Sequence, residues 1–190
     1  MHMAKARLRE KYHGLSRQEL IDAAYELGAS FEKYSGSCSQ STVAAIHEVL
    51  EIDDVLVKVA TSLCGGSAEQ FLGTCGTLSG GIMVLDYFFG RPVEKLSYQD
   101  ENEADEEALY VAFEPAQRLA DRFWQEYGTI HCAGIQRQLF GRFYCLTDPG
   151  EFEKFKAAGS HSDSSKTTRV VGNAAKWVME ILLEEEVVEV

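Results

Sequence analysis

A glycine-rich turn that carries a cysteine and leads directly into an apolar segment constrains the fold more than any other stretch. It reads GTCGTLSGGIMVL and runs from Gly73 to Leu85. The residues after the turn are apolar on nearly every side, which is typical of a helix that is buried all round. Thr74 is a suitable N-cap for this helix. We therefore expect a central helix for which the rest of the chain forms the scaffold.

Helical patterns also dominate the rest of the chain, and no alternating run is long enough for a core strand. The tetrapeptide Ser16-Arg17-Gln18-Glu19 is a capping box, which opens a helix with apolar residues at helical spacing. Similar apolar stripes recur towards the C-terminus and are separated by glycines and prolines. In the long pattern over 104–127, Pro115 predicts a kink or a break, with Pro115 in a new first turn.

These patterns predict an all-α fold, a single-domain bundle of about seven or eight helices. We expect one domain over residues 1–190, with 1–15 as an N-terminal extension and 16–190 as the helical core. The length of 190 residues and the hydrophobic content of 45% are sufficient for a proper core.

The charge balance and the apolar stretches narrow the classes of partner. The formal net charge of −12 argues against nucleic acid and anionic membranes, because both would be repelled. The longest apolar stretch, 78–89, is too short to cross a bilayer and contains Asp86, so we expect no membrane span. The first residues lack the apolar core of a secretory signal. Five widely spaced cysteines without a C-x-x-C motif then predict a reducing, cytoplasmic location.

Three of the five cysteines fall at the predicted starts of helices. Cys38, Cys75 and Cys132 each lie in a first turn beside Gly, Ser or Thr residues, where free backbone N–H groups and the helix dipole favour a thiolate. Cys64 precedes Gly65-Gly66 at a helix C-terminus, so we expect it to pack as a small hydrophobe. The hypothesis that follows is a shared thiol site, assembled by folding from distant segments.

Two chemistries fit such a site, and the cysteine spacing does not choose between them. Thiolates held together exchange with disulfides and alternate as attacking and resolving groups. Soft thiolates in a dry interior also bind an iron–sulfur cluster or a transition metal such as zinc or copper(I). A third interpretation is a helical binding or adaptor protein whose cysteines only pack. Gly76 and Gly80 would lie against a bound cofactor, although close helix packing is the better explanation of glycines in this stretch.

Six segments of the chain share a pattern with a known family. They are Cys38-Ser39-Gln40-Ser41, Thr74 to Gly81, Tyr127 to Cys132, Phe140-Gly141-Arg142, Asp148-Pro149 and Val170 to Ala175. In this order they resemble the bacterial and archaeal C_GCAxxG_C_C family, whose signature marks redox-active proteins. The resemblance covers the chain from roughly Gly36 to the C-terminus and implies a redox role for the signature cysteines.

Two positions depart from the family's pattern. Thr77 stands where the signature prefers alanine, a change between small residues that packing tolerates. The last cysteine of the signature, expected just before Val170, is absent, and Thr167 or Thr168 occupies its place. If the activity needs all four thiols, the departure leaves open a three-ligand cluster, an altered chemistry or a loss of redox activity.

We therefore expect an all-helical redox or metal-binding protein, with Cys75 as the activated thiolate and Cys38 and Cys132 as resolving thiols or co-ligands. Cys145 or Cys64 would supply a fourth thiol, with Cys145 as a further metal ligand. The cofactor that these thiols would hold is an iron–sulfur cluster or a thiolate-bound transition metal. An electron-transfer partner or a small redox substrate fits such a site. Enzymatic activity and assembly into a homo-oligomer stay open.

Overall fold

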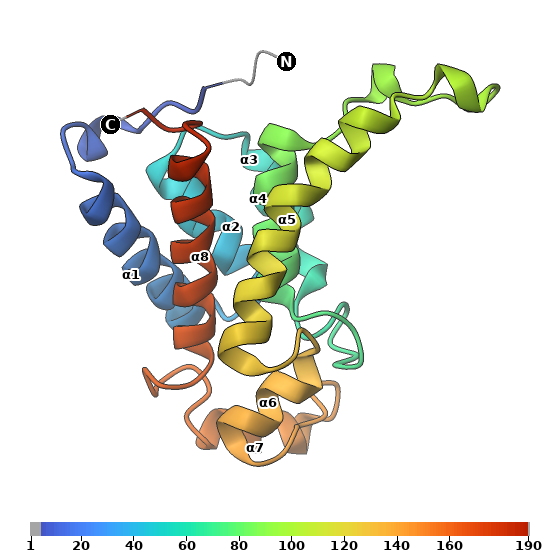
Figure 1. Ribbon diagram of the computed structural model, residues 1–190. Helices are drawn as coiled ribbons and strands as arrows, with labels where there is room; N and C mark the ends of the chain where they lie inside the picture. The colour runs from blue at the N-terminus through green and yellow to red at the C-terminus, as the bar shows by residue number, and fades with distance from the viewer. Residues whose placement is uncertain (1–4, 190) are drawn as a thin grey trace.

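Eight α-helices form between residues 5 and 189, the part of the chain that the computed structural model describes (Figure 1). They are α1 (Arg17–Ser35), α2 (Cys38–Val49), α3 (Asp54–Val59), α4 (Gly76–Phe89), α5 (Glu106–Tyr127), α6 (Cys132–Phe140), α7 (Pro149–Ala157) and α8 (Thr167–Glu184). Short 3₁₀ helices lie at Glu10–Tyr12, Thr61–Leu63, Val93–Lys95 and Glu101–Glu103. Within the described residues the only β-contacts are isolated bridges, so the predicted all-α, single-domain fold is confirmed.

The helix ends largely follow the signals in the sequence. The Ser16 hydroxyl accepts a hydrogen bond from the Glu19 backbone N–H, and the Glu19 carboxylate accepts one from the Ser16 N–H, which completes the capping box. Gly128 and Gly141 end α5 and α6 in the left-handed conformation that glycine favours. The expected new helix at Pro115 is wrong, because α5 runs continuously through this residue. Pro115 is buried with the apolar face of α5, and this packing outweighs the one backbone hydrogen bond that proline removes.

Helices α1, α2, α4, α5 and α8 enclose the core, and α6 and α7 lie together at one end of the molecule (Figure 1). Helix α8 packs most extensively against α1, and α4 contacts α2, α5 and α8. Within α4 only Asp86 and Tyr87 are exposed, which confirms the expected buried helix. Neither α4 nor any other helix within residues 5–189 combines the length and apolar character that crossing a membrane requires. The fully buried core side chains include Leu20, Ile46, Leu78, Leu85, Leu119, Phe123, Met179 and Leu182.

Glycines let two pairs of helices approach closely. A Cβ atom at Gly80 of α4 would overlap the carbonyl oxygen of Ser39 in α2. A Cβ atom at Gly28 of α1 would lie 2.9 Å from the carbonyl oxygen of Val171 in α8. Side chains cannot occupy these positions without moving the backbone, so the absence of a Cβ atom sets the spacing of both helix pairs.

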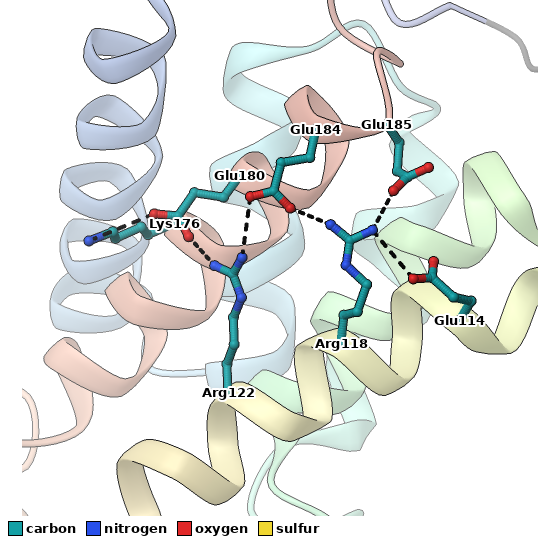
Figure 2. A network of polar contacts seen from close by, with 7 residues as sticks. All are labelled: Glu114, Arg118, Arg122, Lys176, Glu180, Glu184 and Glu185. Atoms are coloured by element: carbon teal, nitrogen blue, oxygen red, sulfur yellow. Dashed lines mark hydrogen bonds and ion pairs between the residues drawn. The ribbon is translucent and has the colours of Figure 1, made fainter.

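Ion pairs join α5 to α8 along the solvent edge of their contact (Figure 2). Arg122 pairs with Glu180 and, at 3.6 Å, with Glu184, while Arg118 pairs with Glu184 and Glu185. All of these side chains are partly exposed, and such pairs each contribute at most about 1 kcal/mol. The network therefore fixes the register of the two helices more than it stabilises the fold. Its outer members are Glu114 and Lys176.

The described part of the expected N-terminal extension lies against the helical core. Ala6 forms a bridge with Val188, and Leu8 forms one with Leu50. The first described residues thus lie beside the C-terminal segment and the end of α2 (Figure 1). Residues 1–4 of the expected extension lie outside the described residues.

We expect Gly80→Ala to lower the free energy of unfolding by about 1–3 kcal/mol, because the added methyl group must push α2 and α4 apart. In a helix with room for a side chain, the same change would instead stabilise the protein by about 1 kcal/mol. Urea unfolding followed by circular dichroism measures the difference. Ser79→Ala, at the neighbouring half-buried position, is the matched control and should change stability by less than about 1 kcal/mol. An unchanged or higher stability of Gly80→Ala would contradict this packing.

Candidate functional site

Four cysteines line one cavity that α6 and α7 help to enclose. They are Cys38, Cys64, Cys75 and Cys132. Cys38 and Cys64 are partly exposed and are called the outer pair below, whereas Cys75 and Cys132 are only 6% and 8% exposed and are called the inner pair. Much of the remaining wall is apolar and consists of Ile135, Leu139, Leu146, Phe152, Phe155 and Val170.

Three of these cysteines occupy the helix starts that the sequence predicts. Cys38 is the first residue of α2, and Cys132 is the first residue of α6. Cys75 is the N-cap of α4, one residue later than the expected cap at Thr74. The structure therefore brings the three sequence-predicted cysteines to one cavity from three separate helix starts.

Two distant loops pair to bring the starts of α4 and α6 together. Thr74 and His131 form an antiparallel bridge. Next to it, the Cys75 N–H donates to the Ile130 carbonyl oxygen at 2.7 Å. The Cys132 N–H donates in return to the carbonyl oxygen of residue 73 at 3.1 Å. These backbone hydrogen bonds place the inner pair on neighbouring segments.

The sulfur atoms of the outer pair are in contact. The Cys38 thiol donates to the Cys64 sulfur, and the two Sγ atoms lie 3.5 Å apart. A Cβ atom at Gly76 would lie 2.6 Å from the Cys38 sulfur, so glycine leaves the space that this contact needs. Gly65 and Gly66, with φ of 63° and 79°, turn the chain directly after Cys64. The expectation that Cys64 only packs as a small hydrophobe is wrong, because folding brings it to the start of α2.

Hydrogen bonding makes Cys64 the more acidic thiol of the outer pair. The Cys38 thiol lowers the pKa of Cys64 to about 7, with further help from the Cys38 N–H and the Ser37 hydroxyl and against the opposing effect of burial. The pKa of Cys38 is raised well above its ordinary value, because the same hydrogen bond retains its proton and burial disfavours its thiolate. The outer pair therefore loses its first proton near neutral pH, and the hydrogen bond from Cys38 favours Cys64 as the sulfur that carries the charge.

Burial makes both thiols of the inner pair less acidic than an ordinary cysteine. The pKa of Cys75 is raised by burial, although its sulfur forms a 3.0 Å hydrogen bond with the Thr77 hydroxyl. Burial likewise raises the pKa of Cys132 to about 12. Burial therefore argues against Cys75 as the activated thiolate that its helix start predicts, because the cost of desolvating the charge outweighs the helix N-terminus.

A buried carboxyl group shares the cavity with the thiols. The Glu32 side chain, from α1, is only 3% exposed, and its Oε1 atom lies 3.7 Å from His161 Nε2. Its Oε2 atom has no hydrogen-bond partner among residues 5–189. Burial raises the pKa of Glu32 to about 8, and the negative charge of Cys64 adds to this effect. The hydroxyls of Ser41 and Thr167 offset only part of the shift, so Glu32 is largely protonated at neutral pH.

The helical period of α1 carries a signal for Glu32 that the cysteine pattern does not contain. Glu32 follows Leu20, Ala24 and Gly28 at intervals of four residues, and all four positions are buried on one face of α1. A carboxyl group on such a stripe is unusual, because burying a charge without a partner costs several kcal/mol. This cost is comparable to the whole free energy of unfolding of a typical domain. The helical period therefore marked Glu32 as an inward-facing polar residue.

The structure also distinguishes the candidates for the fourth thiol. Thr167 lines the cavity at the place where the signature leads us to expect a cysteine, whereas the Thr168 hydroxyl donates to the Asp163 carbonyl oxygen at 3.1 Å. Cys145 lies outside this cavity, in a surface depression near Arg142, so the expectation that Cys145 joins the site is wrong. Cys64 is therefore the fourth thiol of the cavity.

The residues present do not form a metal site in this arrangement. Among residues 5–189, no three His, Cys, Asp or Glu side chains lie in positions that could hold a metal ion together. Gly76 and Gly80, the expected cofactor-binding glycines, lie against α2 and do not line the cavity. Their role in the fold is close packing, because both would clash with α2 or the Cys64 turn if they carried a side chain.

We expect Cys64 to be the cavity thiol that alkylates at the lowest pH. Its reaction with iodoacetamide should rise with a midpoint near the pKa of about 7, and Cys38→Ala should move this midpoint upward because the hydrogen-bond donor is removed. Mass spectrometry of the individual cysteine peptides measures each reaction. Cys132→Ala, which removes a thiol without contact to Cys64, should leave the midpoint in place. A lower midpoint for Cys75 than for Cys64 would contradict the assignment.

Glu32 should make the protein less stable as the pH rises. Its pKa is about 8 in the folded protein and near 4.5 in the unfolded chain, so between these values only the folded state keeps the proton. Stability is then lost with rising pH, by at most about 1.4 kcal/mol per pH unit. Glu32→Gln, which cannot ionise, should gain stability relative to wild type across this window in urea unfolding experiments. The control Glu26→Gln, at an exposed position of α1, should show a constant difference, and a constant difference for Glu32→Gln would refute the buried proton.

Comparison with known proteins supports the resemblance found in the sequence. The family model described as "Putative redox-active protein (C_GCAxxG_C_C)" matches residues 36–181, a range that contains all four cavity cysteines. No match was found among curated proteins or among solved structures. Because the family match extends over most of the sequence, the chain belongs to the C_GCAxxG_C_C family.

Proposed function

We propose that the protein exchanges electrons with disulfide substrates through the outer pair, Cys38 and Cys64. The observation that carries this proposal is the 3.5 Å contact between a thiol and a neighbouring sulfur that ionises near neutral pH. Thiol–disulfide exchange depends on this combination, because a thiolate attacks and a second thiol close by resolves the intermediate.

The proposed reaction has two balanced steps. First, the Cys64 thiolate attacks one sulfur of a disulfide RSSR, a mixed disulfide forms on Cys64, and one RS⁻ leaves. Second, Cys38 loses its proton and attacks the Cys64 sulfur, the Cys38–Cys64 disulfide forms, and the second RS⁻ leaves. The protein gives up two electrons to the substrate, and the proton from Cys38 converts one of the released thiolates to RSH. A dithiol donor reverses both steps and restores the reduced pair.

Access and distance support the outer pair as the reacting pair. Both of its side chains are partly exposed, so a substrate sulfur can reach Cys64 without opening the core. The two sulfur atoms need to approach each other by only about 1.5 Å to form a disulfide bond. The apolar residues of the cavity wall suit the organic part of a small disulfide or an apolar side chain of a protein partner.

The inner pair takes no part in the first step of the proposed reaction. Cys75 and Cys132 are buried and keep their protons, so they neither attack nor compete for the substrate during the first step. A binding or adaptor protein with cysteines that only pack would not need a thiol of lowered pKa beside a second thiol. The electrostatics of Cys64 thus favour the redox interpretation over the structural one.

The test is exchange with glutathione disulfide, starting from protein reduced and purified without oxygen. We expect the wild type to lose two thiols and to yield a linked peptide pair containing Cys38 and Cys64. Cys64→Ser should slow the first step by about tenfold or more, because the acidic thiolate is gone, and Cys38→Ser should accumulate glutathione on Cys64. Cys145→Ser, which removes a cysteine outside the cavity, is the control and should behave as wild type.

Three results would contradict the proposal. Exchange at the wild-type rate in Cys64→Ser would show that the outer pair does not react first. A stoichiometric metal in the same anaerobic preparation, lost in Cys38→Ser or Cys64→Ser, would favour the metal-binding interpretation instead. Intact stability without any exchange would favour a structural role for the cysteines.

A further inference from the structure

Glu32 presents an unpaired oxygen in the cavity that holds the reacting thiols. The residue is 2% exposed, and its Oε2 atom finds no hydrogen-bond partner among the described residues. The Ser41 and Thr167 hydroxyls lie near enough to lower the pKa of the carboxyl group, but within residues 5–189 neither forms a hydrogen bond with Oε2, and the Thr167 hydroxyl donates to the Ser160 carbonyl oxygen. A buried polar atom without a partner needs an explanation, and a role in the chemistry of the site is one such explanation. The position of the carboxyl beside the thiols suggests that the reason is proton transfer.

The second step of thiol exchange needs a base, and the cavity offers few. Cys38 must lose its proton before it attacks, yet burial and its hydrogen bond to Cys64 hold that proton. His161 is a weak base, since burial and the charge of Lys156 lower its pKa, and Glu69 is exposed at the edge of the cavity. Five ionisable groups from the surrounding elements line the cavity together with Glu32. They are Cys38 of α2, Cys64 and Glu69 of the turn after Thr61–Leu63, Cys75 at the start of α4, and His161 of the segment before α8.

We infer that Glu32 is the proton carrier of the outer pair. Its carboxylate accepts the Cys38 proton while the Cys38 sulfur attacks Cys64, and its carboxylic acid form supplies a proton to the first released thiolate. This inference rests on the proposed function, because it assigns a role within the same two-step exchange.

The charge of Cys64 couples the two roles of Glu32. In the resting protein the Cys64 thiolate helps to keep Glu32 protonated. When Cys64 enters the mixed disulfide its charge disappears, so Glu32 becomes more acidic and gives its proton to the departing RS⁻, which leaves as RSH. The resulting carboxylate then takes the proton of Cys38 as the S–S bond between Cys38 and Cys64 forms and the second RS⁻ leaves. The proton and the negative charge of the reduced pair leave as one RSH and one RS⁻, and Glu32 ends protonated as it began.

His161 provides a route between this carboxyl and water. Its Nε2 atom lies 3.7 Å from Glu32 Oε1, and its side chain is 23% exposed. A neutral imidazole passes a proton by accepting on one nitrogen and donating from the other. This route lets Glu32 equilibrate with solvent while the cavity is occupied.

The test follows the release of nitrothiobenzoate from the chromogenic disulfide dithiobis(nitrobenzoate), in a Cys145→Ser background that silences the thiol outside the cavity. The first release reports attack by Cys64, and the second reports resolution by Cys38. We expect Glu32→Gln to leave the first rate within about threefold, because this leaving group needs no proton, and to slow the second by about tenfold or more. The second rate of the wild type should follow the ionisation of Glu32 in the mixed disulfide, at a pH below the resting pKa of about 8 because the Cys64 charge is gone. In Glu32→Gln this pH dependence should disappear, and the second rate should follow only the ionisation of Cys38.

The control is Glu26→Gln, the same substitution at an exposed position of the same helix, which should resolve at the wild-type rate. Resolution by Glu32→Gln at that same rate would overturn the inference while the proposed function stood. If the wild type releases no nitrothiobenzoate from the outer pair, the proposed function itself is refuted.

A measurement on the wild type tests the role of Glu32 as proton carrier even if Glu32→Gln fails to fold. Infrared difference spectroscopy should show the C=O stretch of a protonated carboxyl in the reduced protein at neutral pH. This band should weaken when Cys64 is alkylated, because alkylation removes the charge that holds the Glu32 proton. A band that is absent, or that alkylation leaves unchanged, would overturn the inference.

Discussion

The close approach of α2 and α4 is the constraint on which both the core and the site depend. Gly80 lets the backbone of α4 lie against the carbonyl group of Ser39, and Gly76 leaves room for the Cys38 sulfur beside the Cys64 turn. With side chains at these positions the two helices would have to separate, and the outer pair would lose its contact. The same two glycines therefore set the helix spacing and the geometry of the thiols, although neither lines the cavity.

Within the cavity, the balance between desolvation and hydrogen bonding decides which thiol carries charge. The backbone N–H groups of Thr77 and Leu78 favour the Cys75 thiolate, yet burial raises the pKa of both Cys75 and Cys132. Cys64 has no favourable helix start of its own, but in space it lies at the N-terminus of α2 and accepts the Cys38 hydrogen bond. Desolvation also explains Glu32, whose proton is retained because burial disfavours the carboxylate and the charge of Cys64 adds to that effect.

The local parts of the fold were accessible from the sequence because they rest on neighbouring residues. The Ser16 capping box, the glycine ends of α5 and α6 and the apolar stripes all act within one or two turns of helix. The break expected at Pro115 failed for a tertiary reason, since the buried face of α5 holds the helix together through that residue. The first turns at Cys38 and Cys132 and the N-cap at Cys75 were likewise local features, and the structure has them.

The sequence by itself thus determined the helices, the buried character of α4 and three of the four thiols that line the cavity. Only the tertiary structure decided that Cys64 joins them in place of Cys145, that Thr167 rather than Thr168 faces the cavity, and that Glu32 shares it. The physical reason is that helix formation depends on near neighbours in the chain. The ionisation of a thiol depends on burial and on hydrogen bonds from groups far away in the sequence, and these exist only after the helices have packed.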